Sequence, residues 1–172
     1  MGYEHNEYNR GRGGFLSSIP PVTKNIVAIN IIVFIATLIN ENFMVVNFAM
    51  FYPASPFFKP WQILTHMFMH GGFWHIFFNM YTLLMFGIIL ERALGSKKFL
   101  IFYFVTGLGA AALHTGVEWI QAQYFLSAGA AVNYHNLLMT PTLGASGAIY
   151  GELIGYASIH HRNVPAYEPR SN

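Results

Sequence analysis

Four long apolar stretches, separated by polar or proline-rich segments, dominate the pattern of this chain. They occupy residues 26–39, 73–90, 99–117 and 146–159. A helix needs about 20 apolar residues to cross a bilayer. With their flanking residues included, the stretches predict four membrane-spanning helices at about 22–39, 73–94, 97–117 and 146–160.

Local signals mark the ends of these helices. Thr23 is a candidate N-cap of the first, and Gly95 stands where a C′ glycine would end the second. Three prolines prevent a continuous helix in the aromatic segment 40–60, which we expect to lie in the membrane interface. We expect an irregular loop at 118–143. The predicted organisation is a polar arm at 1–21, a membrane domain at 22–161 and a polar tail at 162–172.

The composition favours a membrane protein over a soluble one. The chain is 54% apolar and only 9% charged, against about 25% charged for a soluble domain. It has no Asp and no Cys, which excludes disulfides and cysteine nucleophiles. A net charge of +2 is too small to indicate nucleic-acid binding. The predicted fold class is an all-α, polytopic helical bundle with lipid as its solvent, and no feature calls for a cofactor.

The basic residues predict an orientation. They cluster before the first span, between the second and third, and after the fourth, whereas the other loops hold only Lys59. Cytoplasmic loops are enriched in Lys and Arg. We therefore expect both termini in the cytoplasm, with the N-terminal ends of the second and fourth spans together at the outer side.

His75 and Asn79 lie four residues apart in the second span and therefore on one helical face. Both can donate hydrogen bonds toward a common point, as a developing oxyanion requires. They could equally hold neighbouring helices together. The pair alone leaves both interpretations open.

Ser146 stands between Ala145 and Gly147 at the start of the fourth apolar stretch. Serine is common at such positions as an N-cap. The neighbouring glycines also leave its hydroxyl uncrowded. The predicted topology places Ser146 at the same depth as His75 and Asn79, which favours a catalytic site.

A zinc site is disfavoured. His66, His70 and His75 could supply three ligands, but a metalloprotease would carry His-Glu-x-x-His with a glutamate base. No acidic residue stands among these histidines, so we expect no metal.

The fourth stretch also carries Gly147, Gly151 and Gly155 at intervals of four. Such a stripe allows another helix to approach closely. It predicts a contact with a complementing chain or a second copy of this one. Glu152 lies within the same stretch, either paired or protonated.

Taken in order, the motifs resemble those of rhomboid intramembrane serine proteases between Trp61 and Gly151. They are Thr65-His66-x-x-x-His70, His75-x-x-x-Asn79, Gly87-x-x-x-Glu91-x-x-Leu94-Gly95 and Gly144-Ala145-Ser146-Gly147-Ala148-Ile149-Tyr150-Gly151. The resemblance implies a rhomboid-like bundle with four transmembrane helices present of an expected six, and therefore a chain lacking its last spans.

The resemblance also implies roles. Ser146 would be the nucleophile, with His75 and Asn79 stabilising the oxyanion. Tyr150, on which the family's catalytic histidine stacks, and Gly144 would face the substrate. His66 and His70 would be structural.

The general base is absent by this comparison, because the family takes its histidine from the sixth span. His160 and His161 stand 14 and 15 residues after Ser146, about 21 Å along a helix, beyond hydrogen-bond reach. His114 and His135 remain as substitutes, although no orienting partner for either is evident in the sequence.

Two functions follow. The first is a rhomboid-type serine endopeptidase that cleaves transmembrane segments of membrane-protein substrates, inactive as given because its base is missing. The alternative is a non-catalytic pseudoprotease that binds transmembrane clients. In both cases we expect a multi-pass protein of the bacterial inner membrane.

Overall fold

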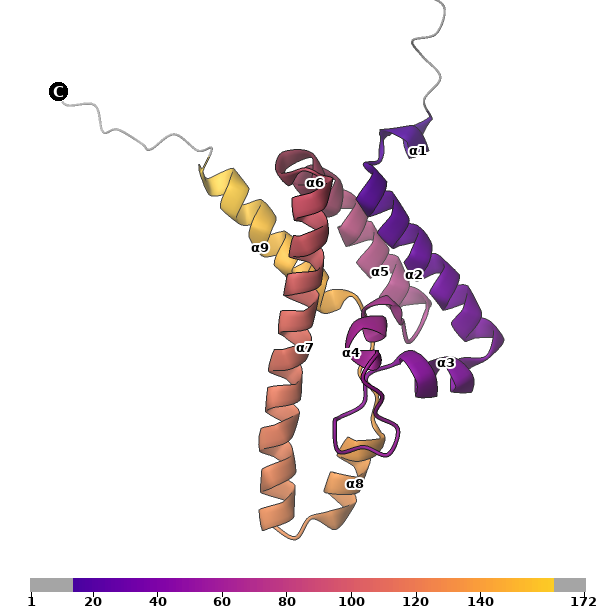
Figure 1. Ribbon diagram of the computed structural model, residues 1–172, viewed down its shortest axis with the longest axis vertical. Helices are drawn as coiled ribbons and strands as arrows, with labels where there is room; N and C mark the ends of the chain where they lie inside the picture. The colour runs from indigo at the N-terminus through magenta and orange to yellow at the C-terminus, as the bar shows by residue number, and fades with distance from the viewer. Residues whose placement is uncertain (1–13, 163–172) are drawn as a thin grey trace, which may run out of the picture.

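The computed structural model describes residues 14–162, and this part is an all-helical bundle (Figure 1). This confirms the predicted fold class. The helices are α1 (Phe15–Ser18), α2 (Pro21–Ile39), α3 (Glu41–Phe48), α4 (Gln62–Thr65), α5 (Phe73–Thr82), α6 (Ile88–Leu94), α7 (Ser96–Ser127), α8 (Ala131–Met139) and α9 (Ser146–Arg162). A 3-10 turn (His66–Phe68) follows α4, and a π-helical segment (Leu83–Gly87) joins α5 to α6.

Three helices are long and apolar enough to cross a membrane: Pro21–Ile39, Phe73–Leu94 and Ser96–Ser127. Their outward faces carry large exposed apolar side chains, among them Ile32, Leu38, Trp74, Phe78 and Val105. In water this surface would be unstable, so it suits contact with lipid. The fourth expected span forms α9, which has 17 residues.

Glu91 holds together the end of the bundle where α2, α6 and α7 meet. Its carboxylate accepts hydrogen bonds from the backbone N–H groups of Val22 and Thr23 at 2.9 and 2.7 Å. The hydroxyls of Thr23 and Ser96 add bonds of 2.8 and 2.7 Å. These donors include N–H groups from the first turn of α2, which have no acceptor within that helix. Gly95, at φ +80°, then ends α6 as expected.

Helices α7 and α9 cross at close range, and glycines make the contact possible (Figure 1). A Cβ at Gly147 would collide with Ala110, and one at Gly151 would collide with Thr106. One at Gly155 would lie 2.9 Å from the ring of Phe102. The glycine stripe is therefore filled by α7 of the same chain. The expected close helix contact at Gly147, Gly151 and Gly155 is therefore made within the chain, while a contact of these glycines with a second copy or a complementing chain stays a prediction.

The segment 118–143 is largely helical, which corrects the expectation of an irregular loop. Helix α7 continues to Ser127, ten residues past the predicted end at 117, and α8 follows after a short turn. The apolar pattern stops at Glu118, but no glycine or proline interrupts the helix before Gly129. Figure 1 shows α8 beside the far end of α7.

The first loop, 40–60, contains the helix α3, and α4 follows directly after it. The side chain of Gln62 donates to the carbonyls of Val46 and Phe57, both at 3.0 Å. Met50 pairs with Thr142 through two backbone hydrogen bonds of 3.0 and 2.7 Å. The loop is thus tied to the strand-like segment that leads into α9.

Candidate active site

Ser146 is the first residue of α9 and follows an extended segment from Thr140 to Ala145. Gly144 has φ +119°, a conformation that L side chains rarely adopt. Its N–H donates to the carbonyl of His66 at 3.0 Å, which fixes the segment against the 3-10 turn that follows α4. The N–H groups of the first turn of α9, which Ser146 begins, have no intrahelical acceptors.

His75 reaches this segment from α5. A Cβ on residue 144 would lie 2.8 Å from His75 Nε2, so glycine there makes room for the ring. The N–H of Gly71 donates to His75 Nδ1 at 3.4 Å. A neutral ring with Nδ1 as acceptor carries its proton on Nε2. The ring therefore presents an N–H beside Gly144, two residues before Ser146.

Asn79 lies one helical turn beyond His75 on α5. It is 9% exposed, and its Nδ2 has no hydrogen-bond partner among residues 14–162. A buried amide donor without an acceptor is costly, and most buried polar groups are paired. Among the described residues, Asn79 Nδ2 is therefore a buried donor without an acceptor.

A cavity of about 250 Å³ opens beside Ser146 between α7 and α9. The residues that line it are His66, Gly107, Ala110, Ala111, His114, Thr142, Leu143, Gly144, Ser146, Gly147 and Tyr150. Tyr150, one turn after Ser146, is 68% exposed. The predicted residues Ser146, Gly144 and Tyr150 thus share one cavity. His75 and Asn79 are not among its lining, and only His75 is seen in contact with this segment.

His66 and His70 are buried. His66 Nδ1 lies 3.0 Å from the carbonyl of Gln62, and burial lowers the pKa of His66. Burial, with a smaller contribution from neighbouring His75, lowers the pKa of His70 to about 4. Both rings are therefore neutral near pH 7. Among the described residues, no group of three or more His, Cys, Asp or Glu is arranged to hold a metal ion.

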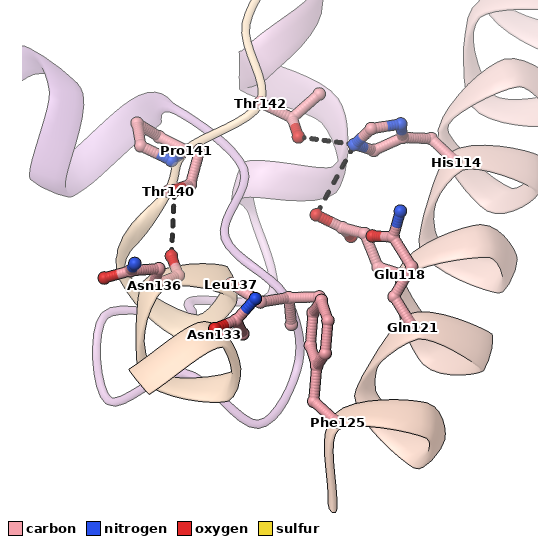
Figure 2. A pocket seen from close by; sticks show the side chains of 10 residues that line it. All are labelled: His114, Glu118, Gln121, Phe125, Asn133, Asn136, Leu137, Thr140, Pro141 and Thr142. Carbon is pink, nitrogen blue, oxygen red and sulfur yellow. Dashed lines mark hydrogen bonds and ion pairs between the residues drawn. The ribbon is translucent and has the colours of Figure 1, made fainter. Parts of the chain in front are cut away.

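His114 has an orienting partner, which the sequence interpretation missed. Its Nε2 lies 2.9 Å from the hydroxyl of Thr142 and 3.4 Å from Oε1 of Glu118, as Figure 2 shows. Glu118 is four residues further along α7, a spacing that places it on the same helical face. That spacing was visible in the sequence and could have revealed the pair. His135 lies on α8, and His160 and His161 lie at the far end of α9.

A family model described as the Rhomboid domain matches residues 57–169, which is more than half of the chain. The chain belongs to the rhomboid family. The resemblance drawn from the motifs is therefore confirmed, and the apolar helices are those of an integral membrane protein.

Curated relatives extend the comparison. This rhomboid is 28% identical to "Rhomboid-related protein 4" of Mus musculus over 78% of the chain and 40% of that relative. It is 33% identical to "Rhomboid protease AarA" of Providencia stuartii over 53% of the chain and 31% of the relative. A match of 35% to "Inactive RHOMBOID-like protein 8" of Arabidopsis thaliana covers 28% and 14%.

One of these rhomboid relatives is named a protease and another is named inactive. The chain spans less than half the length of each of them. Membership of the family therefore makes a hydrolase the natural class, while the activity of this chain is a matter for proposal.

Proposed function

We propose that this chain carries the nucleophile and oxyanion-binding groups of a rhomboid-type serine endopeptidase that cleaves transmembrane segments of other membrane proteins. The observation that carries the proposal is the contact between the His75 ring and Gly144, two residues before Ser146. It joins a donor on α5 to a hydroxyl on α9 at one end of the bundle.

In this mechanism the Ser146 hydroxyl attacks the scissile carbonyl, and a new C–O bond forms as the carbonyl oxygen becomes an oxyanion. His75 Nε2–H, the Asn79 amide and N–H groups of the first turn of α9 donate to that oxyanion. Collapse of the tetrahedral intermediate breaks the peptide bond, and the leaving amine takes a proton. Water then hydrolyses the acyl-enzyme.

A serine hydroxyl needs a base to remove its proton. By the family resemblance this base is a histidine from a later span, and we propose that a complementing chain supplies it. Within the chain, His114 Nε2 already contacts Thr142 and Glu118, and His66 Nδ1 already contacts Gln62. Both rings line the Ser146 cavity, but among the described residues no hydrogen bond joins either ring to the Ser146 hydroxyl, so we assign neither as the base. Tyr150 and Gly144 form part of the wall against which the substrate lies.

A fluorophosphonate probe on native membranes tests the nucleophile. With a complementing chain that supplies the histidine base co-expressed, we expect labelling that Ser146→Ala abolishes. Ser127→Ala, which alters an exposed serine at the end of α7, should leave the labelling intact. Labelling that survives Ser146→Ala, or none under any condition, would remove the proposal.

The orientation is part of the proposal, with both termini in the cytoplasm of a bacterial inner membrane. Basic residues of the α6–α7 junction support it, and α1 and the last described turn of α9 lie at the same end as α6 (Figure 1). The chain has no cysteine, so an introduced one reports without background. A membrane-impermeant maleimide added to intact cells should label Ser127→Cys but not Lys98→Cys. The reverse pattern would overturn this orientation.

A second candidate function is client binding without cleavage. The match to a relative named inactive favours keeping it. Cross-linking to a single-pass client that Ser146→Ala does not change, together with no Ser146-dependent cleavage, would support it over the protease.

A further inference from the structure

A second and larger cavity, of about 560 Å³, lies between the far end of α7, α8 and the segment before α9 (Figure 2). Its lining residues are His114, Glu118, Gln121, Phe125, Asn133, Asn136, Leu137, Thr140, Pro141 and Thr142. Most of these side chains are polar, which is unusual for a cavity beside a helix of this apolar character. The cavity therefore suits a polar occupant.

Glu118 is the group in this cavity with an unmet requirement. It is 8% exposed, and its Oε2 has no hydrogen-bond partner in the described part of the chain. Its Oε1 lies 3.4 Å from His114 Nε2, at the long end for a hydrogen bond. The same nitrogen is closer to the Thr142 hydroxyl, at 2.9 Å. One nitrogen with at most one proton cannot satisfy both neighbours, so Glu118 is short of donors.

Apart from His114, whose contact with Glu118 is the long one already described, the other lining groups supply no positive charge. Gln121, Asn133 and Asn136 are neutral amides, and no Lys or Arg is among the described residues that line the cavity. A mostly buried carboxylate is costly unless a cation pairs with it. The cavity thus offers one anionic group, surrounded by amides that can orient a second polar partner.

This cavity is adjacent to the Ser146 cavity, because His114 and Thr142 line both. It also lies toward the end of a long helix. The 32 residues of α7 extend about 48 Å, whereas the hydrocarbon of a bilayer is about 30 Å thick. The last turns of α7, next to Gln121 and Phe125, therefore reach the region where the polar flank of a transmembrane client would run.

We propose that this cavity binds a Lys or Arg side chain from the segment flanking a client's transmembrane helix, with Glu118 as its counter-ion. This inference rests on the proposed function, because the Lys or Arg side chain belongs to the client that would lie at Ser146. The Gln121, Asn133 and Asn136 amides orient the client backbone beside it. Glu118 would then determine which clients are held at Ser146.

The test measures capture rather than cleavage. A photo-cross-linking phenylalanine replaces Leu137, and single-pass clients carry one Arg or one Gln, moved stepwise along the flanking segment. We expect capture to fall about tenfold when Arg becomes Gln at the best position, as loss of one charge-assisted contact implies. Glu118→Gln should remove the preference for Arg, whereas Glu41→Gln, which removes an exposed charge on α3, should preserve it.

The outcomes separate the two proposals. Equal capture of Arg and Gln clients at every position, or no capture from residue 137, overturns this inference even if Ser146 labelling succeeds. Preference for Arg in a Ser146→Ala background upholds it even if no cleavage is found. Competition by methylguanidinium without any preference among clients would mean that the cavity takes a free small cation, which also overturns it. The comparison of Arg with Gln clients changes only the client and leaves this protein unaltered. A folding defect in Glu118→Gln therefore cannot obscure that comparison.

Discussion

Two buried glutamates, one on α6 next to the start of α7 and one in the second half of α7, differ in how many hydrogen bonds their carboxylates accept. Glu91, beside the start of α7, accepts four hydrogen bonds from α2 and Ser96. Glu118, toward its other end, has one long contact and one oxygen without a partner in residues 14–162. Asn79, in α5, likewise has a free amide donor.

The difference separates stability from function in this molecule. A buried polar group with all its partners fixes the arrangement of its helices. A buried polar group without partners reduces stability and persists where something else will supply the partner. The Glu91 end should therefore respond to mutation through unfolding, and the Ser146 end through binding and chemistry.

The largest effect is expected at Glu91. Glu91→Ala leaves the N–H groups of Val22 and Thr23 without their acceptor, and we expect a loss of about 3–5 kcal/mol in the free energy of unfolding. Denaturation in detergent, followed by circular dichroism, measures it. Glu41→Ala, at an exposed carboxylate, should cost less than about 1 kcal/mol. Equal effects of the two would mean that Glu91 does not join the helices.

At Asn79 we expect a small effect of mutation on stability and a large effect on the reaction at Ser146. Asn79→Ala removes an amide whose Nδ2 has no partner in the described residues, so we expect little change in stability. The rate of fluorophosphonate labelling at Ser146 should fall about 10²–10³-fold, as for loss of one oxyanion donor.

Asn30 provides the matched control, since its buried amide donates to the carbonyl of Ile26 at 2.7 Å. Asn30→Ala should lower stability and leave the labelling rate of the folded fraction unchanged. If Asn79→Ala instead destabilises the protein as much as Asn30→Ala does, Asn79 is a structural residue.

The glycine contact between α7 and α9 should give the next effect. Gly151→Ala places a methyl group against Thr106, and overpacking of this kind costs about 1–3 kcal/mol. Gly109→Ala, on α7 where nothing lies within 4 Å of the added Cβ, should be neutral or stabilising by up to about 1 kcal/mol. Thermal unfolding of both variants compares them. A Gly151→Ala protein as stable as the parent would argue against the observed crossing.

Much of the fold could be predicted from the sequence, because continuous stretches of apolar residues identify lipid-facing helices. The helices that became α2, α5–α6, α7 and α9 were all expected within a few residues of their starts. The end of α7 was missed because hydropathy falls at Glu118, while the helix continues through Gln121 and Phe125. A polar helix outside the hydrocarbon has no such signal.

Less of the site could be predicted from the sequence, because the site is formed by contacts between helices that are far apart along the chain. The motif Gly144–Tyr150 identified Ser146, but only the fold places His75 against Gly144. The capping of α2 by Glu91 joins residues 69 positions apart, which no local pattern reveals. The His114–Glu118 pair is local and could have been found by testing every fourth residue.

The smallest expected effect is a pH dependence of the unfolding free energy caused by His70. It tests whether a second buried group near Ser146 lacks hydrogen-bond partners. Its ring is 1% exposed, neither nitrogen has a partner in the described chain, and its pKa is lowered to about 4 against 6.5 for the unfolded state. Below pH 6.5 the unfolded chain therefore binds a proton that the folded chain excludes. Stability should fall between about pH 6.5 and pH 4, by about 1 kcal/mol at pH 5.5.

The measurement is the difference in unfolding free energy between pH 7 and pH 5.5, compared among variants. His70→Gln should reduce this difference, because the titrating ring is gone. His135→Gln, which removes an exposed ring on α8, should leave it as in the parent. Burial also lowers the pKa of His66, which therefore contributes to the difference in the same direction. If His70→Gln leaves the pH dependence of the unfolding free energy unchanged, water or a neighbouring group satisfies the His70 ring. Asn79 would then be the residue with an unpaired donor at the Ser146 end of the described chain.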